Sequence, residues 1–123
     1  MIGIYNAEDN TVTASYCHYD GYLAYNGAVL LESYNTQYDA EMVAKGGYLS
    51  GLKEDYAEAR AEAVHKDPAI VYDSPEVFLR CGDNHAGAEY LYLFDGEAWF
   101  YTDTAKKRSE RRFEEVEMNL AKK

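Results

Sequence analysis

The strongest structural signal in the chain is the stretch Glu89-Tyr90-Leu91-Tyr92-Leu93-Phe94-Asp95-Gly96-Glu97-Ala98-Trp99-Phe100-Tyr101-Thr102. Two runs that are rich in aromatic residues flank the pair Asp95-Gly96. Such a pair between two strand-forming runs is typical of a β-hairpin that is closed by a two-residue type I′ loop. The stretch therefore predicts two antiparallel strands and a protein built around a β-sheet.

A second hairpin is predicted near the start of the chain. Segments 2–6 and 11–17 alternate apolar residues with other residues, as half-buried strands do. The intervening Glu8-Asp9-Asn10 tolerates the backbone of a tight turn. The short β-branched run from Ala69 to Tyr72 is a further candidate strand.

Helices are predicted between the two hairpins, at residues 23–34, 36–46, 53–65 and 74–81. Thr36 and Ser74 are suitable N-caps for the second and fourth helices. The pair Gly46-Gly47 is typical of a left-handed cap at the end of the second helix. The third helix is rich in Ala and Glu and has a thin apolar face, so it is expected to lie on the surface.

The charged segment 104–123 is predicted to form a C-terminal helix. Phe113, Val116 and Leu120 are spaced for one apolar stripe along such a helix. The stripe either docks on the domain or stays free until the helix meets a partner.

These elements predict the fold class. A length of 123 residues fits a single domain, and 47% hydrophobic residues are enough for a core. We expect one α+β domain over residues 1–123. Its mainly antiparallel sheet comes from the two hairpins, and the helices pack on one face.

The charge of the chain is acidic and unevenly distributed. The chain has 12 basic and 22 acidic side chains, which gives a net charge of −10. Residues 1–103 carry a net charge of −13, whereas residues 104–123 carry +3. This balance argues against direct binding of nucleic acid or an anionic membrane, and it favours solubility or a partner with a basic surface. No apolar run is long enough to span a bilayer and no signal peptide is apparent, so a cytoplasmic location is expected.

The motif Tyr16-Cys17-His18-Tyr19-Asp20-Gly21-Tyr22 stands at the predicted junction between a strand and a helix. Its rings and polar groups form a candidate ligand site, with rings that stack on a base and polar tips that fix it. The alternative is a structural motif in which Asp20 caps the following helix and His18 orients the loop. The candidate ligand or structural residues are Tyr16, His18, Tyr19, Asp20 and Tyr22.

Several segments resemble a family of small bacteriophage proteins that carry a tyrosine-cysteine-histidine-aromatic-aspartate-glycine-tyrosine motif. The resemblance is carried by Ile2-Gly3-Ile4, Thr11-Val12-Thr13, Tyr16 to Tyr22, Gly27-Ala28-Val29-Leu30-Leu31, Tyr34-Asn35, Leu49-Ser50-Gly51-Leu52, and the aromatic hairpin with Trp99. The chain departs from the family where Leu23 replaces a common proline and where a helical pattern fills residues 53–70. The resemblance implies a phage accessory protein in a bacterial cytoplasm, and it assigns no chemical activity.

Catalysis, a metal and a cofactor are not expected. Cys17, His18, Cys81 and His85 lack the spacing of a structural zinc site, and Cys17 and His18 point to opposite faces of a strand. No complete nucleophile, base and orienting group is visible in the sequence. We therefore expect a binding protein rather than an enzyme.

The leading functional hypothesis is a non-enzymatic bacteriophage protein that binds and inhibits a host protein, for host takeover or counter-defence. Exposed aromatic residues and an acidic helix face would bind the partner, because Tyr and Trp dominate binding hot spots. The predicted partner-binding residues are Tyr90, Tyr92, Trp99, Tyr101, Glu54 and Glu58. The opposing interpretation is that one face of the hairpin is simply core.

Three alternatives remain open at this stage. Glu54, Asp55, Glu58 and Glu62 could imitate the phosphates of DNA, although the basic tail weakens that hypothesis. The hairpin edge could pair with a second copy of the chain and form a homodimer. A small-molecule or nucleotide-binding domain, centred on residues 16–22, would sequester its ligand. A phosphate ligand would then need Arg80, Arg108, Arg111 or Arg112, because the motif has no basic residue other than His18.

Overall fold

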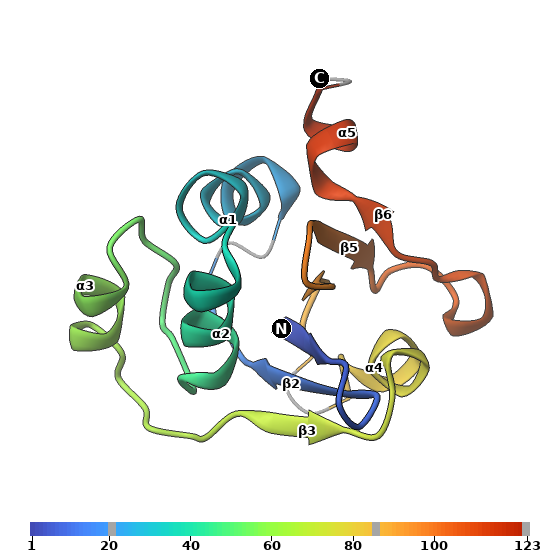
Figure 1. Cartoon of the computed structure of the whole chain (residues 1–123), viewed down its shortest axis with the longest axis horizontal. Coiled ribbons are helices and arrows are strands. Elements are labelled where there is room, and N and C mark those ends of the chain that lie inside the picture. Colours follow the sequence, from blue (N-terminus) through green and yellow to red (C-terminus); the bar gives the residue numbers. More distant parts are fainter. Residues whose placement is uncertain (20–21, 85–86, 122–123) are drawn as a thin grey trace.

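The computed structural model describes residues 1–19, 22–84 and 87–121. It shows one six-stranded sheet with the strand order β3-β2-β1-β4-β5-β6 and helices around it (Figure 1). The strands are β1 (Ile2–Asn6), β2 (Thr11–Ser15), β3 (Ile70–Tyr72), β4 (Tyr90–Phe94), β5 (Trp99–Asp103) and β6 (Glu114–Glu115). The α-helices are α1 (Ala28–Ser33), α2 (Gln37–Lys45), α3 (Tyr56–Ala61), α4 (Pro75–Cys81) and α5 (Val116–Ala121). The α+β class is confirmed.

The sheet is mixed, so the prediction of a sheet made from antiparallel hairpins is only partly right. Both hairpins form, with β1 antiparallel to β2 and β4 antiparallel to β5. The two hairpins join through β1 and β4, however, and these strands run parallel, with Ile2 opposite Tyr92 and Ile4 opposite Phe94. A local alternation pattern identifies a strand but does not show which distant strand it meets.

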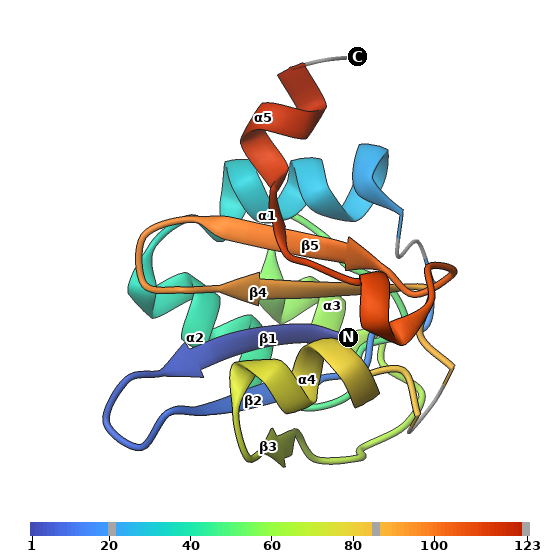
Figure 2. The same cartoon turned by 90° about the vertical axis from the view of Figure 1, so that its right-hand side faces the viewer.

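Helices cover both faces of the sheet, which corrects the prediction that they pack on one face. In Figure 2, α4 lies across the front of the sheet while α1 and α2 lie behind it. Alternate residues of β4 explain this arrangement. Tyr92 and Phe94 enter the core under α1 and α2, and Leu91 and Leu93 enter the core on the α4 side. A central strand that is apolar on both faces must be covered on both.

Gly3 allows α4 to approach β1 closely. A Cβ atom at this position would lie 3.2 Å from the ring of Phe78 and 3.0 Å from a methyl group of Val12. Glycine inside a strand often marks such an approach of a neighbouring element. The Phe78 ring is fully buried in this space.

The loop of the β4–β5 hairpin differs from the predicted two-residue turn. Phe94 pairs with Trp99, so the loop contains the four residues 95–98. The side chain of Asp95 accepts hydrogen bonds from the backbone N–H groups of Glu97 and Ala98, both at 2.9 Å. Gly96 has a φ of +108°, a left-handed conformation that glycine favours. Asp95 and Gly96 therefore close the hairpin, but in a longer loop.

The helical predictions for 23–34, 36–46 and 74–81 are confirmed with local detail. The first begins as a π-helical turn, Leu23–Gly27, and continues as α1. Thr36 caps α2 by accepting a hydrogen bond from the N–H of Asp39 at 3.2 Å. Ser74 caps α4 in the same way through the N–H of Val77 at 3.1 Å, with Pro75 in the first turn.

The helix that was predicted over residues 53–65 is shorter than expected. Only Tyr56–Ala61 forms α3, and its one buried residue is Ala59. A thin apolar face gives a helix little packing energy, and short helices depend on packing for their stability. Glu62, Val64 and His65 instead line a pocket.

The prediction of one C-terminal helix over 104–123 is wrong. The segment contains a 3₁₀ turn (Arg108–Glu110), the short strand β6 and only then α5. Phe113 packs on the α4 side of the sheet, whereas Val116 enters the opposite core, so the two do not share a helical stripe. β6 pairs with Phe100 and Tyr101 of β5, which covers part of the hairpin edge that the homodimer hypothesis requires.

Arg111 explains why this segment is not a helix. Arg111 is 5% exposed, and its guanidinium makes a bidentate contact with the carboxylate of Asp83 at 2.9 and 3.0 Å. The same guanidinium donates hydrogen bonds to the backbone carbonyls of Leu79 and Thr104. Because Arg111 is fully engaged within the fold, it does not serve as the phosphate-binding group that was considered from the sequence.

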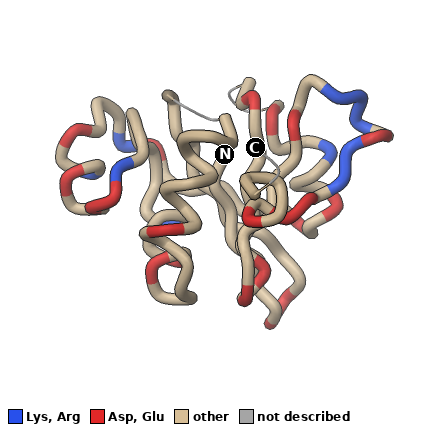
Figure 3. The backbone as a smooth tube through the Cα atoms, turned by 90° about the horizontal axis from the view of Figure 1, so that it is seen from above, with Lys and Arg blue, Asp and Glu red and all other residues tan. Residues whose placement is uncertain are grey.

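The charges are separated on the surface. In Figure 3, Lys and Arg gather in the connection between β5 and β6, while Asp and Glu are spread over the other elements. Asp and Glu therefore outnumber Lys and Arg outside this connection. Among the described residues, no helix has both the length and the apolar character that a membrane span requires.

Candidate functional site

The motif continues β2 beyond the sheet and pairs with the segment that follows α2. The N–H of His18 donates to the carbonyl of Leu49 at 3.0 Å, and the N–H of Tyr19 donates to the carbonyl of Ser50 at 2.9 Å. Cys17 and Leu49 form a parallel bridge. Residues 16–19 and 49–50 are therefore joined by main-chain hydrogen bonds. This pairing points alternate motif side chains away from the core.

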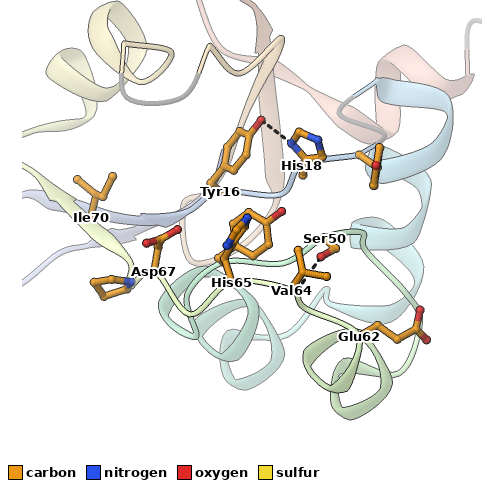
Figure 4. A pocket seen from close by; sticks show the side chains of 11 residues that line it. Tyr16, His18, Ser50, Glu62, Val64, His65, Asp67 and Ile70 are labelled. Atoms are coloured by element: carbon orange, nitrogen blue, oxygen red, sulfur yellow. Dashed lines mark hydrogen bonds between the residues drawn. The ribbon is translucent and has the colours of Figure 1, made fainter.

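A pocket of about 530 Å³ opens beside this pairing (Figure 4). Its wall combines four segments that are separate in the sequence: the motif, the connection after α2, the end of the α3 region and the approach to β3. The lining residues are Tyr16, His18, Tyr19, Tyr48, Ser50, Glu62, Val64, His65, Asp67, Pro68 and Ile70. Three of the five motif residues predicted from the sequence, Tyr16, His18 and Tyr19, are among them.

Five aromatic rings form a continuous chain along the wall of the pocket. The chain runs from His65 to Tyr48, with ring centres 5.0 Å apart, and from Tyr48 to Tyr16 at 5.9 Å. It continues from Tyr16 to His18 at 5.9 Å and from His18 to Tyr19 at 4.6 Å. The pairs His65–Tyr48, Tyr16–His18 and His18–Tyr19 meet edge to face, which is a favourable geometry for aromatic rings.

Hydrogen bonds from the surrounding backbone hold the pocket in shape. The N–H of Tyr48 donates to the carbonyl of Asp67 at 2.8 Å, and the guanidinium of Arg60 donates to the carbonyl of Tyr48 at 2.8 Å. The N–H of Val64 donates to the hydroxyl of Ser50 at 3.1 Å, a contact that Figure 4 also shows. A site that is held in this way loses little conformational entropy when a ligand binds.

The motif and the π-helical turn after it carry three exposed tyrosine side chains. Tyr19 is 61% exposed, Tyr22 is 52% exposed and Tyr25 is 40% exposed. Tyr19 lines the pocket of Figure 4 and two neighbouring hollows, one beside Tyr22 and one beside Tyr25. Val64, which is 73% exposed, lies at the rim. We call the exposed side chains of Tyr19, Tyr22, Tyr25 and Val64 the tyrosine surface.

The polar groups of the motif are mostly engaged within the protein. The hydroxyl of Tyr16 is 3.2 Å from Nδ1 of His18, and burial together with nearby Tyr48, Cys17 and Glu89 raises the pKa of Tyr16. Cys17 is buried, and its thiol donates to the carbonyl of Tyr19 at 3.4 Å.

Two sequence predictions concern residues that the structure does not describe. Asp20, the predicted cap or ligand group, and His85, a member of the disfavoured zinc set, both lie outside the described residues. Tyr22 precedes the π-helical turn, and its side chain makes no capping hydrogen bond. Within the described ranges, no three His, Cys, Asp or Glu side chains are grouped closely enough to hold a metal ion.

The hairpin residues predicted to bind a partner divide into two groups. Tyr92 and Trp99 are each 1% exposed, so their prediction as exposed anchors is wrong. The indole N–H of Trp99 donates to the carbonyl of Tyr34 at 3.0 Å, which fixes the ring in the core. Tyr90 and Tyr101 are half-buried on the same face and pack against Tyr92. The interpretation of this hairpin face as core is therefore the right one for Tyr92 and Trp99.

The predicted acidic residues lie close to the pocket. Glu54 precedes α3 and Glu58 lies within it, and both are exposed. The ammonium of Lys53 lies 3.9 Å from Glu58 and 3.6 Å from Glu62, so part of this acidic face is neutralised within the chain. Fewer carboxylates on this face are therefore free to imitate DNA phosphates than the sequence indicated.

Eight of the eleven residues that line the pocket were not predicted as ligand residues from the sequence. Tyr48 falls in a segment that was expected to be a compact connection, and His65 falls in the predicted helix 53–65. Val64 was expected only on the thin apolar face of that helix, and Asp67 was not singled out. The available signals were the glycine pair before Tyr48 and Pro68 after Asp67, since both mark places where the chain leaves a helix and turns.

Comparison with known proteins adds no relative to this description. No protein-family model matches the chain, and no significant match was found among curated proteins or solved structures. The assignment of a function therefore depends on the residues and the geometry described above.

Proposed function

We propose that the protein is a bacteriophage accessory protein that acts without catalysis in the host cytoplasm, by binding and inhibiting a host protein. The observation that carries this proposal is the tyrosine surface, where the exposed Tyr19 lines the pocket and also shares one neighbouring hollow with Tyr22 and another with Tyr25. The bacteriophage setting rests on the sequence resemblance of the same motif.

The chemistry of the surface supports a protein partner. Tyrosine contributes a large contact area at a low cost in side-chain entropy, and it is enriched at the centres of binding interfaces. The pocket within the surface offers a place for one anchoring side chain of the partner. The exposed carboxylates of Glu54 and Glu58 lie on the neighbouring α3 region and would form an acidic rim.

The acidic charge defines the kind of partner. With a net charge of −13 over residues 1–103, the protein attracts basic surfaces and accelerates its association with them. The interface is expected to include the motif and to exclude Tyr92 and Trp99, which are core residues. Its rate of association should fall as salt is added, because screening weakens long-range attraction.

A second candidate function is the sequestering of a small molecule in the pocket. The specific support is the convergence of Tyr16, His18 and Tyr19 with Tyr48 and His65 around a cavity of ligand size. Lys and Arg are absent from the lining, as far as the described residues show. A phosphate-bearing nucleotide therefore fits this lining poorly, and an uncharged or cationic ring compound fits it better.

The test is a pull-down of the tagged protein from bacterial lysate at moderate salt, read by mass spectrometry. The double variant Tyr19→Ser, Tyr22→Ser should lose the partner, because it removes the centre of the tyrosine surface. The matched control is Tyr38→Ser, since Tyr38 is 78% exposed on α2 and lines none of the three hollows around Tyr19.

Two results would count against the proposal. The first is a partner that is retained by the Tyr19, Tyr22 variant and lost by the Tyr38 variant. The second is the absence of any stoichiometric protein with the unchanged chain. Native mass spectrometry of the purified protein would then test the second candidate function directly.

A further inference from the structure

The pocket of Figure 4 has the composition of a site for an organic cation. Its wall holds the chain of five aromatic rings that runs from His65 to Tyr19. The faces of its three tyrosine rings carry negative electrostatic potential, and cations bind over them. The walls come from both sides of the opening, with the motif on one side and the segment 64–68 on the other.

Two carboxylates add negative charge to the pocket. Asp67 and Glu62 line it, and no Lys or Arg does so among the described residues. The ammonium of Lys53 lies 3.6 Å from Glu62, so that carboxylate is already shared. Asp67 has no such partner: within the described part of the chain, its carboxylate makes no hydrogen bond or ion pair, and it lines the same pocket as Tyr16 and His65 (Figure 4).

We infer that this pocket binds the guanidinium of an arginine side chain on the surface of the protein partner. A guanidinium is planar, so it stacks on aromatic faces while its N–H groups bind a carboxylate. In this site it would stack among the rings of the chain and donate to the carboxylate of Asp67. The exposed ring of Tyr19 and the exposed side chain of Val64 would contact the partner residues next to that arginine.

The inference deepens the proposed function and rests on it for the source of the arginine. The charge of the whole chain favours the same occupant, because a net charge of −10 attracts a basic surface. The alternative source of the same chemistry is a free guanidinium compound. An experiment on the isolated protein separates the two sources and does not depend on the identity of the partner.

The test uses nuclear magnetic resonance titrations of the full chain with three probes. The first is a short peptide, blocked at both ends, with a central arginine between glycines; the second replaces that arginine with glutamine; the third is free arginine amide. We expect the arginine peptide to shift resonances of Tyr16, His18 and His65, with affinity in the millimolar range, and the glutamine peptide to shift none of them. A free arginine amide that binds more tightly than the peptide would assign the site to a small molecule and overturn the partner arginine.

A charge-neutral variant tests the role of Asp67. Asp67→Asn should weaken the binding of the arginine peptide by roughly tenfold, because it removes the negative charge that the guanidinium contacts. Asp73→Asn is the matched control, since Asp73 is exposed, carries the same charge and does not line the pocket. The affinity of this control variant for the arginine peptide should stay within about twofold of that of the unchanged chain. If both variants weaken binding equally, only the overall charge matters and the inference fails.

The outcome remains distinguishable from that of the pull-down. A partner that depends on Tyr19 and Tyr22, together with no arginine binding in the pocket, would leave the proposed function standing and overturn the inference. Should Asp67→Asn lose its fold by circular dichroism, Tyr19→Ser provides the second variant. This variant removes the exposed Tyr19 ring at the end of the row of five aromatic rings, and it should also weaken the binding of the arginine peptide.

Discussion

Tyr92 and Trp99 in the β4–β5 hairpin are each 1% exposed, whereas Tyr19 and Tyr22 in the motif are 61% and 52% exposed. Both regions are rich in tyrosine, and the sequence offered both as binding surfaces. They differ in how their backbones are placed. The hairpin lies inside a sheet that helices cover on both faces, while residues 16–19 leave the sheet and pair only with the segment after α2. Burial is therefore decided by the neighbouring elements, and residue type alone does not reveal it.

The largest expected effect comes from the hairpin. Trp99→Ala should destabilise the protein by about 3–5 kcal/mol, because it empties a large buried volume and removes the hydrogen bond to Tyr34. Urea unfolding followed by circular dichroism measures the change. Tyr38→Ala is the control and should stay within about 0.5 kcal/mol of the unchanged chain. If Trp99→Ala changed the free energy of unfolding as little as Tyr38→Ala does, the contrast between the buried hairpin and the exposed motif would fail.

Two aspartates show the same contrast: Asp83 is engaged within the fold, whereas Asp73 is exposed. Asp83→Ala should cost about 3 kcal/mol, because it leaves the buried guanidinium of Arg111 without its carboxylate. Asp73→Ala removes an exposed carboxylate and should have little effect on urea unfolding. Equal effects of the two variants would show that the Arg111 contact does not contribute specifically.

The same contact predicts an acid-sensitive stability. The hydrogen bonds from Arg111 hold the pKa of Asp83 below its usual range, so the carboxylate is charged in the fold at a pH where it would be neutral in the unfolded chain. Its contribution is complete above the unfolded pKa of about 3.9 and is lost as the pH falls through the lowered pKa of the folded state. Urea midpoints between pH 5 and pH 2 should therefore fall less steeply for Asp83→Asn than for the unchanged chain.

A smaller effect is expected at the glycine that connects α2 with the pocket. Gly47 has a φ of +94°, and a Cβ atom there would lie 2.8 Å from the carbonyl oxygen of Asp67. Gly47→Ala should cost about 1–2 kcal/mol of stability and should disturb the pocket wall. Gly51→Ala is the matched control, because a Cβ atom at Gly51 meets no other atom within 4 Å. Thermal unfolding of the two variants would measure the difference.

The smallest effect on stability is expected at the tyrosine surface. Tyr19→Ala and Tyr22→Ala should each change the free energy of unfolding by less than about 0.5 kcal/mol, because both side chains are mostly exposed. Urea unfolding checks this value, and the pull-down reports binding separately. A loss of more than about 1 kcal/mol would show that the motif is structural and would break the contrast with the hairpin.

Local features of the fold could be predicted from the sequence. The two hairpins, the caps at Thr36 and Ser74 and the left-handed glycine at Gly47 each depend on residues that are close in the chain. The parallel pairing of β1 with β4 and the covering of both sheet faces depend on distant contacts. The C-terminal segment illustrates the limit: its helical pattern is overridden by Arg111, which reaches Asp83 in another part of the fold.

The candidate site was predicted only where it lies in one stretch. Tyr16, His18 and Tyr19 were singled out because they are close together in the sequence, and all three line the pocket. Tyr48, His65 and Asp67 come from segments without a chemical motif of their own. They reach the pocket because the chain turns after α2 and again before β3, and no periodicity within either segment shows that they meet.

The parallel pairing of β1 with β4 also has a consequence for how the chain folds during synthesis. Ile2 lies opposite Tyr92, so the middle of the sheet cannot close until most of the chain has been made. Synthesis adds about 5–20 residues per second, which leaves one edge of the first hairpin uncovered for several seconds. An uncovered strand edge can pair with another chain. High-level expression at lower temperature, or with chaperones that hold exposed edges, should therefore increase the soluble yield.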